Sequence, residues 1–299
     1  MTPAKALFLA ARPKTLPAAL APVLLGSACA AAVGKFALIP ALCAGLFALF
    51  AQIASNLAND YGDFKKGADT EARLGPERAT AQGWLSPQQT LTAALTSVFI
   101  AAACGLALVG FGGMWMLAVG IVSVIACLAY SLGPFPLAYH GLGDVFVLVF
   151  FGLVAVAFTT WTQALEFPPF MWLVALACGF GANNILLINN LRDRETDAQA
   201  GKRTTVVRFG KGFAIGFYKF NLVFLFLSPL ALRFIFGMEA LCILLPMVVL
   251  PWMMGSILKT LQNYEDPREL NPLLGKSAQL LLVYALLQSL GLFVQAGGL

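Results

Sequence analysis

The chain has 299 residues, of which 60% are hydrophobic and 11% are charged, and its mean hydropathy is +0.82. Soluble domains are about 45–50% apolar, so this composition excludes an ordinary soluble domain and indicates a polytopic membrane protein. No linker or low-complexity tract divides the sequence, and we expect one domain over residues 1–299. The net charge of +5 then reflects membrane topology, and we expect no nucleic-acid partner.

Apolar segments follow one another along the whole chain. A helix needs about 20 mostly apolar residues to cross the hydrocarbon core of a bilayer, and continuous rather than alternating apolar runs exclude a transmembrane β-barrel. We predict an all-α membrane protein with nine transmembrane helices bundled around a central cavity that opens to the cytoplasmic side. The predicted spans are residues 18–34, 38–59, 89–110, 114–131, 143–163, 170–190, 213–234, 240–258 and 276–296.

The basic residues predict the orientation of these spans, because Lys and Arg favour the cytoplasmic side of a membrane. With the N-terminus in the cytoplasm, all of the 19 Lys and Arg except Lys35 and Arg233 fall in or beside cytoplasmic segments. An odd number of spans then places the C-terminus outside. We predict a multi-pass protein of the cell (inner) membrane whose longest loops, after the second and sixth spans, face the cytoplasm.

Polar side chains occupy one face at the end of the second span, where a simple buried helix would be apolar. Five polar residues have the spacing i, i+4, i+7, i+8 and i+11, which places them on one face of a helix. They are Gln52, Asn56, Asn59, Asp60 and Asp63. A carboxylate at membrane depth costs about 2.5–3.5 kcal/mol on insertion scales and usually marks a functional site. The candidate residues from the following loop are Asp69, Lys66, Arg73 and Arg78.

A second polar cluster stands in the matching place at the end of the sixth span. Asn189, Asp193 and Asp197 are spaced i, i+4 and i+8, so we expect them on one face of a helix. Three bases follow as candidates for phosphate contact, namely Lys202, Arg203 and Arg208. The matching positions suggest a weak internal repeat, which would bring the two clusters together at the interface of two halves.

Two explanations of these aspartates are open. They could be interfacial side chains paired with neighbouring Lys and Arg, or they could converge on a cation. Two clusters in matching positions favour the second explanation, and oxygen ligands from Asp and Asn suit Mg²⁺ that is shared with substrate phosphates. We therefore expect four catalytic aspartates, Asp60, Asp63, Asp193 and Asp197, which bind Mg²⁺ together with Asn59, Asp69 and Asn189.

Carboxylates, a metal and bases around one point suit a diphosphate group, and the apolar remainder of the site would be a groove between helices. A polyprenyl diphosphate, with a charged head and a long hydrocarbon tail, fits both parts. The sequence alone thus predicts a site in the lipid bilayer for a polyprenyl diphosphate with Mg²⁺ as cofactor.

These motifs resemble the two Asp-rich motifs of the intramembrane aromatic prenyltransferase superfamily, whose members form nine-helix bundles. Within it, the chain looks most like the branch that prenylates 1,4-dihydroxy-2-naphthoate in menaquinone biosynthesis. The stretches that carry this resemblance are ARPKTLPAALAPVLLG (11–26), NLANDYGDFKKGADTEARLGPERAT (56–80), YSLGPFPLAYHGLGD (130–144) and NNLRDRETDAQAGKRTTVVRFG (189–210). The resemblance implies transfer of the polyprenyl group to the ring carbon that bears the carboxylate, with loss of CO₂ and diphosphate.

The expected substrate-binding residues are Arg12, Lys14, Asn56, Asn59, Lys66, Arg73, Arg78, Tyr130, Asn189, Lys202 and Arg203. Among them, Arg12 and Lys14 either anchor the first span or contact the acceptor carboxylate. The acceptor could instead be 4-hydroxybenzoate or homogentisate, although the hydroxybenzoate branch has Tyr-x-x-x-Lys and here Tyr130 is followed by Pro134. A secondary transporter with ion-binding aspartates is the alternative of another class, but transporters bind near the bilayer midplane. No pattern in the sequence indicates a prenyl chain length or an oligomeric state.

Overall fold

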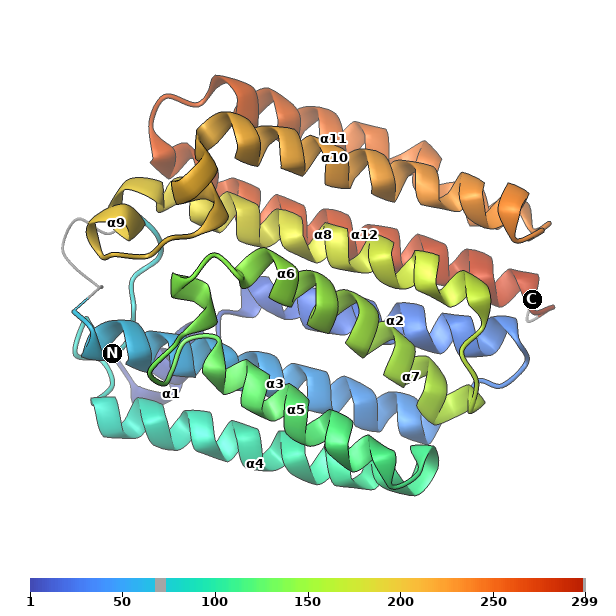
Figure 1. Cartoon of the computed structure of the whole chain (residues 1–299), viewed down its shortest axis with the longest axis horizontal. Helices are drawn as coiled ribbons and strands as arrows, with labels where there is room; N and C mark the ends of the chain where they lie inside the picture. The colour runs from blue at the N-terminus through green and yellow to red at the C-terminus, as the bar shows by residue number, and fades with distance from the viewer. Residues whose placement is uncertain (68–73, 298–299) are drawn as a thin grey trace.

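Long helices run side by side along one axis of the molecule in the computed structural model (Figure 1), which describes residues 1–67 and 74–297. No β-strand occurs within these two ranges, so the predicted all-α class is confirmed. The elements in chain order are α1 (Pro3–Ala10), η1 (Pro13–Thr15), α2 (Leu16–Ala32), α3 (Leu38–Lys65), α4 (Pro87–Gly112), α5 (Trp115–Ala129), η2 (Leu137–Tyr139), α6 (Gly143–Val147), the π-helical η3 (Leu148–Val154), α7 (Ala155–Ala164), α8 (Pro169–Arg192), α9 (Arg194–Gln199), α10 (Thr205–Ile235), η4 (Leu241–Leu244), α11 (Leu245–Asn263), η5 (Pro267–Leu270) and α12 (Asn271–Gln295).

Each predicted span corresponds to a helical segment, but the number of full crossings differs from the prediction. Eight segments of the described chain are long and apolar enough to cross a membrane. The exception is α5, which replaces the predicted span 114–131 and has only 15 residues. At 1.5 Å per residue it is about 22 Å long, against a hydrocarbon core of about 30 Å. The structure therefore supports a helical membrane bundle with eight full-length spans and does not confirm nine.

The helices form layers across the bundle. In Figure 1, α10 and α11 lie along one edge, α4 lies along the opposite edge, and α8, α12 and α2 lie between them. α3 packs along α4, α2 packs against α12 and α7, and α8 packs against α10. Because α2 and α8 are the most buried of the candidate spans, they form the centre on which the other helices pack.

The second predicted span continues as a helix beyond its apolar part. The apolar run of α3 ends near residue 59, but the helix extends to Lys65, which carries the polar face deeper into one end of the bundle. After the loop, α4 begins with a capping box in which Ser86 Oγ accepts a hydrogen bond from the Gln89 N–H and Gln89 Oε1 accepts one from the Ser86 N–H. This cap fixes where the chain re-enters the bundle.

The expectation of one helix through Asn189, Asp193 and Asp197 is wrong, because α8 ends at Arg192 and Asp197 lies on the separate helix α9. Asp193 stands between the two helices with φ −91° and ψ 8°. The i to i−4 hydrogen bonds nevertheless continue across the break, from the Asp193 N–H to the Asn189 carbonyl and from the Asp197 N–H to the Asp193 carbonyl. The three side chains consequently keep roughly the shared face that their spacing predicts.

Glycines allow close approach between the central elements. A Cβ atom on Gly152 of η3 would lie 2.7 Å from the Ala175 carbonyl oxygen and 2.9 Å from the Cα atom of Gly179, both on α8. A Cβ atom on Gly26 of α2 would lie 2.6 Å from the Val156 carbonyl oxygen of α7. These contacts leave no room for side chains, as is usual where membrane helices pack through small residues.

We therefore expect Gly152→Val to lower the thermal stability of the purified protein in detergent, since overpacking a tight contact typically costs about 1–3 kcal/mol. The midpoint of thermal unfolding measures the effect. Gly216→Val on α10 is the matched control, because nothing lies within 4 Å of a Cβ at Gly216. Equal midpoints for the two variants would contradict the packing argument.

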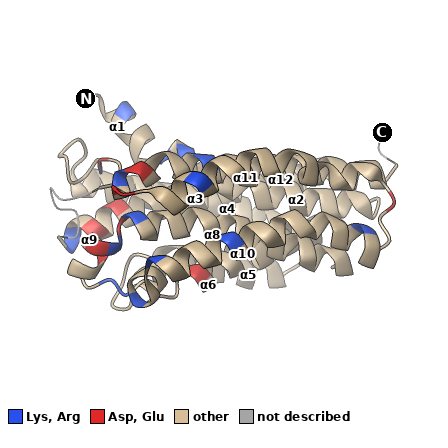
Figure 2. Ribbon diagram, turned by 90° about the horizontal axis from the view of Figure 1, so that it is seen from above, with Lys and Arg blue, Asp and Glu red and all other residues tan. Residues whose placement is uncertain are grey.

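Charged side chains collect at one end of the bundle. Figure 2 shows Lys, Arg, Asp and Glu gathered near α1 and α9, whereas the C-terminal end of the chain lies at the opposite end of the long axis. The polar clusters at the ends of α3 and α8 belong to this charged end. We therefore expect a functional site at this end of the bundle.

Candidate functional site

A cavity of about 690 Å³ lies between the charged ends of the helices. Its walls come from the segment before α2, from the ends of α3 and α8, from α6, and from the first residues of α12. Five basic and six acidic side chains line it among the described residues, namely Arg12, Lys14, Arg78, Arg192, Lys202, Asp60, Asp63, Glu77, Asp144, Asp193 and Asp197. The two predicted polar clusters thus face one space.

The first cluster holds the N-terminal segment against the cavity. All five polar residues of the predicted face, Gln52 to Asp63, line the cavity. Asn56 Nδ2 donates to the Ala11 carbonyl at 2.9 Å, and Arg12 Nη2 donates to Asn59 Oδ1 at 3.0 Å. Arg12 has a left-handed backbone with φ 53°, a conformation that a non-glycine residue keeps only when its surroundings impose it. These bonds supply that constraint and place the Arg12 guanidinium in the wall.

The two carboxylates of α3 have different surroundings. Asp63 accepts hydrogen bonds from Arg78 Nη2 at 2.9 Å and from the Tyr139 hydroxyl at 3.1 Å. Asp60 is only 1% exposed, and its Oδ1 atom has no hydrogen-bond partner among the described residues. A buried carboxylate oxygen without a donor is costly, and a cation bound at Asp60 Oδ1 would remove this cost.

The second cluster is organised by Arg192, which is 2% exposed. Its guanidinium forms a bidentate pair with Asp193, through Nε to Oδ1 at 2.7 Å and Nη2 to Oδ2 at 2.6 Å. Nη2 also donates to Asn189 Oδ1 at 2.9 Å, and Nη1 donates to Asn271 Oδ1 at 3.1 Å. The first and second residues of the predicted motif are therefore held by one buried base.

Lys202 joins the two clusters. Its ammonium nitrogen lies 3.4 Å from Asp63 Oδ1 and 3.5 Å from Asp197 Oδ1. Burial raises the pKa of the Asp197 carboxyl to about 6, an effect that Lys202 opposes and that the charge of Asp193 increases. Burial alone would lower the pKa of Lys202, but the carboxylates of Asp63 and Asp197 raise it. One positive charge therefore sits between carboxylates from both halves of the site.

Not every predicted residue reaches the cavity. Tyr130 and Lys14 line it, whereas Lys66 lies outside with its ammonium nitrogen 4.2 Å from the centre of the Tyr139 ring. Arg203 is exposed, and Arg208 donates to the carbonyls of Arg203 and His140. Of the three bases after the second motif, only Lys202 lines the cavity. Asp69 and Arg73 lie outside the described residues.

Three residues of the site were not predicted as ligands from the sequence. Tyr139 binds Asp63, Asn271 binds Arg192, and Asp144 is a buried carboxylate whose Oδ2 atom accepts a hydrogen bond from Thr205. Asp144 had a visible signal, since it is an acid at the start of an apolar span. Asn271 had none, because it lies 79 residues from its partner and follows no shared spacing.

The carboxylates fit a divalent cation by chemistry, although they do not already converge. Within residues 1–67 and 74–297, no three Asp, Glu, His or Cys side chains form a group that could hold a metal ion. Asp63, Asp193 and Asp197 contact cationic side chains instead. The donors are nevertheless all oxygens, as Mg²⁺ prefers, and the Asp60 Oδ1 atom lacks a partner. The residues thus fit a Mg²⁺ ion that would compete with Lys202 for the same oxygens.

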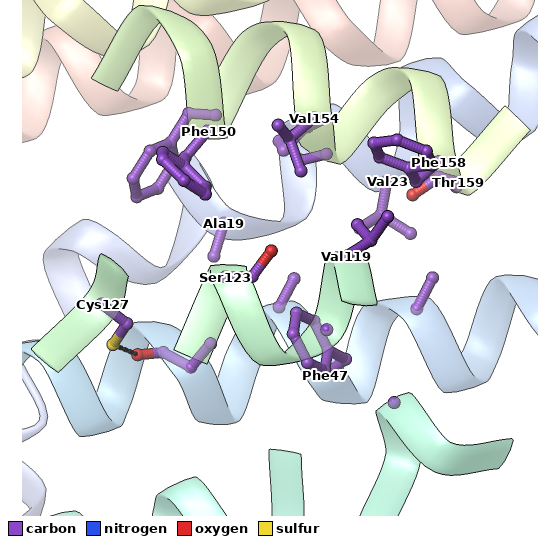
Figure 3. Close-up of a pocket in the computed structure, with 18 of the residues that line it drawn as sticks. Ala19, Val23, Phe47, Val119, Ser123, Cys127, Phe150, Val154, Phe158 and Thr159 are labelled. Carbon is purple, nitrogen blue, oxygen red and sulfur yellow. Dashed lines mark hydrogen bonds between the residues drawn. The ribbon is translucent and has the colours of Figure 1, made fainter. Parts of the chain in front are cut away.

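An apolar pocket of about 150 Å³ adjoins the polar cavity. Figure 3 shows its walls, which include Ala19 and Val23 of α2, Phe47 of α3, Val119 of α5 and Phe158 of α7. Both spaces share four lining residues, Gln52, Ser55, Phe146 and Phe151. A charged compartment and an apolar one therefore lie next to each other within the bundle.

Comparison of the sequence with known proteins identifies relatives that cover most of the chain. Residues 19–276 match the model of the UbiA prenyltransferase family. The 1,4-dihydroxy-2-naphthoate octaprenyltransferase of Escherichia coli is 38% identical, with 95% of this chain and 93% of that protein covered. The enzyme of the same name from Haemophilus influenzae is 36% identical, with 95% and 94% covered. These matches confirm the family and the enzyme class predicted from the two motifs.

Solved structures agree at the level of the fold. The apo structure of a UbiA homologue from Aeropyrum pernix superposes with a TM-score of 0.66 at 16% identity, covering 94% of this chain and 96% of that one. A UbiA homologue from Archaeoglobus fulgidus bound to GPP and Mg²⁺ superposes with a TM-score of 0.56 at 18% identity, covering 92% and 98%. On the family match and on these relatives, the chain belongs to the UbiA prenyltransferase family and is a transferase enzyme of the membrane.

Proposed function

We propose that the protein transfers a polyprenyl group from polyprenyl diphosphate to 1,4-dihydroxy-2-naphthoate, with loss of CO₂ and diphosphate, to give demethylmenaquinol in menaquinone biosynthesis. The observation that carries this proposal is that the charged cavity and the apolar pocket are neighbours, with Gln52, Ser55, Phe146 and Phe151 in the walls of both. The first compartment offers charged groups to a diphosphate, and the second offers apolar walls to a hydrocarbon tail.

The charge of the cavity favours a diphosphate that arrives with metal. The lining has five basic and six acidic side chains among the described residues, so the protein alone offers no net positive charge to an anion that carries several negative charges. Divalent cations supply that charge where phosphates bind between carboxylates. This balance supports Mg²⁺ as the cofactor, and the UbiA homologue from Archaeoglobus fulgidus binds GPP together with Mg²⁺.

The residues that would hold Mg²⁺ are Asn59, Asp60, Asp63, Asn189, Asp193 and Asp197, to which we add Asp69 from the sequence. When bound, Mg²⁺ neutralises the charge that develops on the departing diphosphate. Arg12, Arg78 and Lys202 line the same cavity, and such bases bind phosphate oxygens through charge-assisted hydrogen bonds. If Asp63 and Asp197 held Mg²⁺, the Lys202 ammonium group would be available to bind phosphate oxygens.

The transfer reaction breaks the bond between the first prenyl carbon and its diphosphate oxygen, and diphosphate leaves with the electron pair. The allylic carbon then forms a bond to the ring carbon of the acceptor, and the carboxylate on that carbon leaves as CO₂ while its bonding electrons return to the ring. Phe146 and Phe151, which stand at the junction of the two compartments, are placed to keep water from the allylic carbon.

The acceptor assignment depends on the relatives. Proteins named 1,4-dihydroxy-2-naphthoate octaprenyltransferase are 36% and 38% identical over 95% of this chain, and the Tyr-x-x-x-Lys pattern of the hydroxybenzoate branch is missing after Tyr130. Arg12 and Lys14 line the cavity and supply cationic side chains for the acceptor carboxylate. We therefore place the naphthoate ahead of 4-hydroxybenzoate and homogentisate.

Purified protein should form prenylated product from polyprenyl diphosphate and 1,4-dihydroxy-2-naphthoate only when Mg²⁺ is present. Removal of Mg²⁺ with EDTA should abolish turnover, because the cavity lacks the positive charge to stabilise diphosphate by itself, and re-addition should restore it. The same assay with 4-hydroxybenzoate and with homogentisate ranks the three acceptors by kcat/KM. Undiminished turnover in EDTA would contradict the metal assignment, and substrate-dependent ion flux in proteoliposomes would favour a transporter.

We also propose that the charged end of the bundle faces the cytoplasm, in the inner membrane, with the C-terminus outside. The distribution of basic residues supports this orientation, and the two ends of the chain lie at opposite ends of the bundle (Figure 2). Water-soluble naphthoate and diphosphate would then enter and leave on the cytoplasmic side.

A further inference from the structure

We propose that Gly75, Arg192 and Asn271 form a clamp that positions Asn189 and Asp193 of the second motif, while it ties the loop after α3 to the start of α12. The clamp is a positioning device, and its importance for catalysis depends on the function proposed above. It draws together three segments that are distant in the sequence, one from each third of the chain.

The guanidinium of Arg192 is the centre of the clamp. Four of its contacts are hydrogen bonds to side-chain oxygens, two on Asp193, one on Asn189 and one on Asn271, at 2.6–3.1 Å. Arg has five N–H donors in a rigid planar fork, so this set nearly exhausts them. Because the fork is planar, fixing it at Asn271 also fixes the direction from which it grips Asp193 and Asn189.

Asn271 links this guanidinium to the loop that follows the first motif. Its Oδ1 atom accepts from Arg192 Nη1, and its Nδ2 atom donates to the Leu74 carbonyl at 3.0 Å. The Asn271 side chain thus accepts a hydrogen bond from the second motif and donates one to the loop that follows the first motif. As the first residue of α12, it is attached to a long buried helix and is a rigid support for both.

Gly75 is the third part of the clamp. A Cβ atom at this position would lie 2.6 Å from Arg192 Nη2 and 2.8 Å from its Cζ atom, so the loop backbone passes directly against the guanidinium. Gly75 does not have a left-handed backbone, which means that alanine fits its conformation and is excluded only by the Arg192 side chain. The residue is glycine here because of this contact.

The clamp explains how a carboxylate can be paired with a base and still serve a metal site. Asp193 lines the cavity, and each carboxylate oxygen has a second lone pair after it accepts from Arg192. Partners of this kind orient metal ligands, and their loss typically costs about 10–100-fold in metal affinity or activity. We therefore assign Asn271 and Gly75 an indirect influence on metal affinity, although neither supplies a ligand.

The test compares Asn271→Ala, Asn271→Asp and Gly75→Ala with the wild type. Binding of Mn²⁺ in the presence of inorganic diphosphate, followed by electron paramagnetic resonance, reports the site without any turnover. Asn271→Ala and Gly75→Ala should weaken Mn²⁺ binding about tenfold or more and raise the Mg²⁺ concentration for half-maximal turnover by a similar factor. Asn271→Asp keeps the acceptor for Arg192 but loses the donor to the Leu74 carbonyl, so it should weaken Mn²⁺ binding less than Asn271→Ala does.

Gly275→Ala is the matched control, because it lies one turn further along α12 and nothing lies within 4 Å of a Cβ there. The KM for the acceptor should stay unchanged in Gly75→Ala, whereas the midpoint of thermal unfolding should fall because the added Cβ presses on the buried Arg192 guanidinium. Wild-type Mn²⁺ affinity in Gly75→Ala, or equal weakening in Asn271→Ala and Asn271→Asp, would overturn the clamp. If Asn271→Ala does not fold, Gly75→Ala and Asn271→Asp decide the question. Absence of Mg²⁺-dependent turnover in the wild type would instead count against the proposed function, since Mn²⁺ binding is measured without it.

Discussion

Asp60→Asn is expected to reduce kcat by about 10²–10³-fold at saturating substrates while the protein keeps its fold. The amide has the shape of the carboxyl group but lacks the charge that would hold Mg²⁺. Asp60 is 1% exposed and its Oδ1 atom has no hydrogen-bond partner among the described residues, so loss of its charge removes a burial cost. Radiolabelled product formation and the thermal unfolding midpoint measure the two effects.

Glu77→Gln is the control for this experiment. Glu77 also lines the cavity, but it is exposed and lies on the loop rather than on the polar face of α3. The variant should retain most of the wild-type kcat. Normal turnover in Asp60→Asn, or an equal loss in Glu77→Gln, would mean that position on the helical face does not select the catalytic carboxylates.

Asp193→Asn provides a contrast within the same prediction. Its carboxylate is the counter-ion of the buried Arg192 side chain, and removing one partner of a buried pair costs about 3–5 kcal/mol. We expect this variant to lose turnover and also to unfold at a lower temperature, unlike Asp60→Asn. The difference between the two variants separates a carboxylate that is held for a metal from one that also stabilises the bundle.

Much of the fold follows from features that are local in the sequence. Apolar runs of helical length mark the spans because a bilayer imposes a minimum length, and the polar face of α3 follows from a spacing that a helix converts into one stripe. The short helix α5 was not predicted in this way. The apolar run over residues 114–131 has 18 residues, but only 15 of them are helical, because the residues at both ends of the run form turns. Hydropathy does not say how much of a run becomes helical.

The partners of the carboxylates could not be predicted in the same way. Lys202 is 139 residues from Asp63, and Asn271 is 79 residues from Arg192, so no helical period relates them. Their positions depend on how loops dock at the end of the bundle. The sequence also treats Lys202, Arg203 and Arg208 as equivalent bases, whereas only the fold of the loop after α9 turns Lys202 towards Asp63 and Asp197 and leaves the other two outside.

The apolar pocket provides the second major prediction, which concerns the length of the prenyl tail. Along α3, Asp60 at the charged end and Phe47 in the pocket are 13 residues apart, or about 20 Å. Gly120 of α5 lines the pocket, and no atom lies within 4 Å of a Cβ at this position. An aromatic ring placed there would occupy space that a long tail needs and leave the charged cavity unchanged.

Gly120→Phe should therefore lower kcat/KM for octaprenyl diphosphate by about 10–100-fold, because binding energy from the remote part of a substrate contributes to transition-state stabilisation. Dimethylallyl diphosphate, whose five carbons stay near the diphosphate, should react as in the wild type. Ile121→Phe is the matched control, since Ile121 is the next residue on α5 but is 51% exposed on the outer surface. If both diphosphates lose activity equally in Gly120→Phe, the pocket is not where the tail lies. If only the long substrate loses activity, the α5 helix limits the room for the tail.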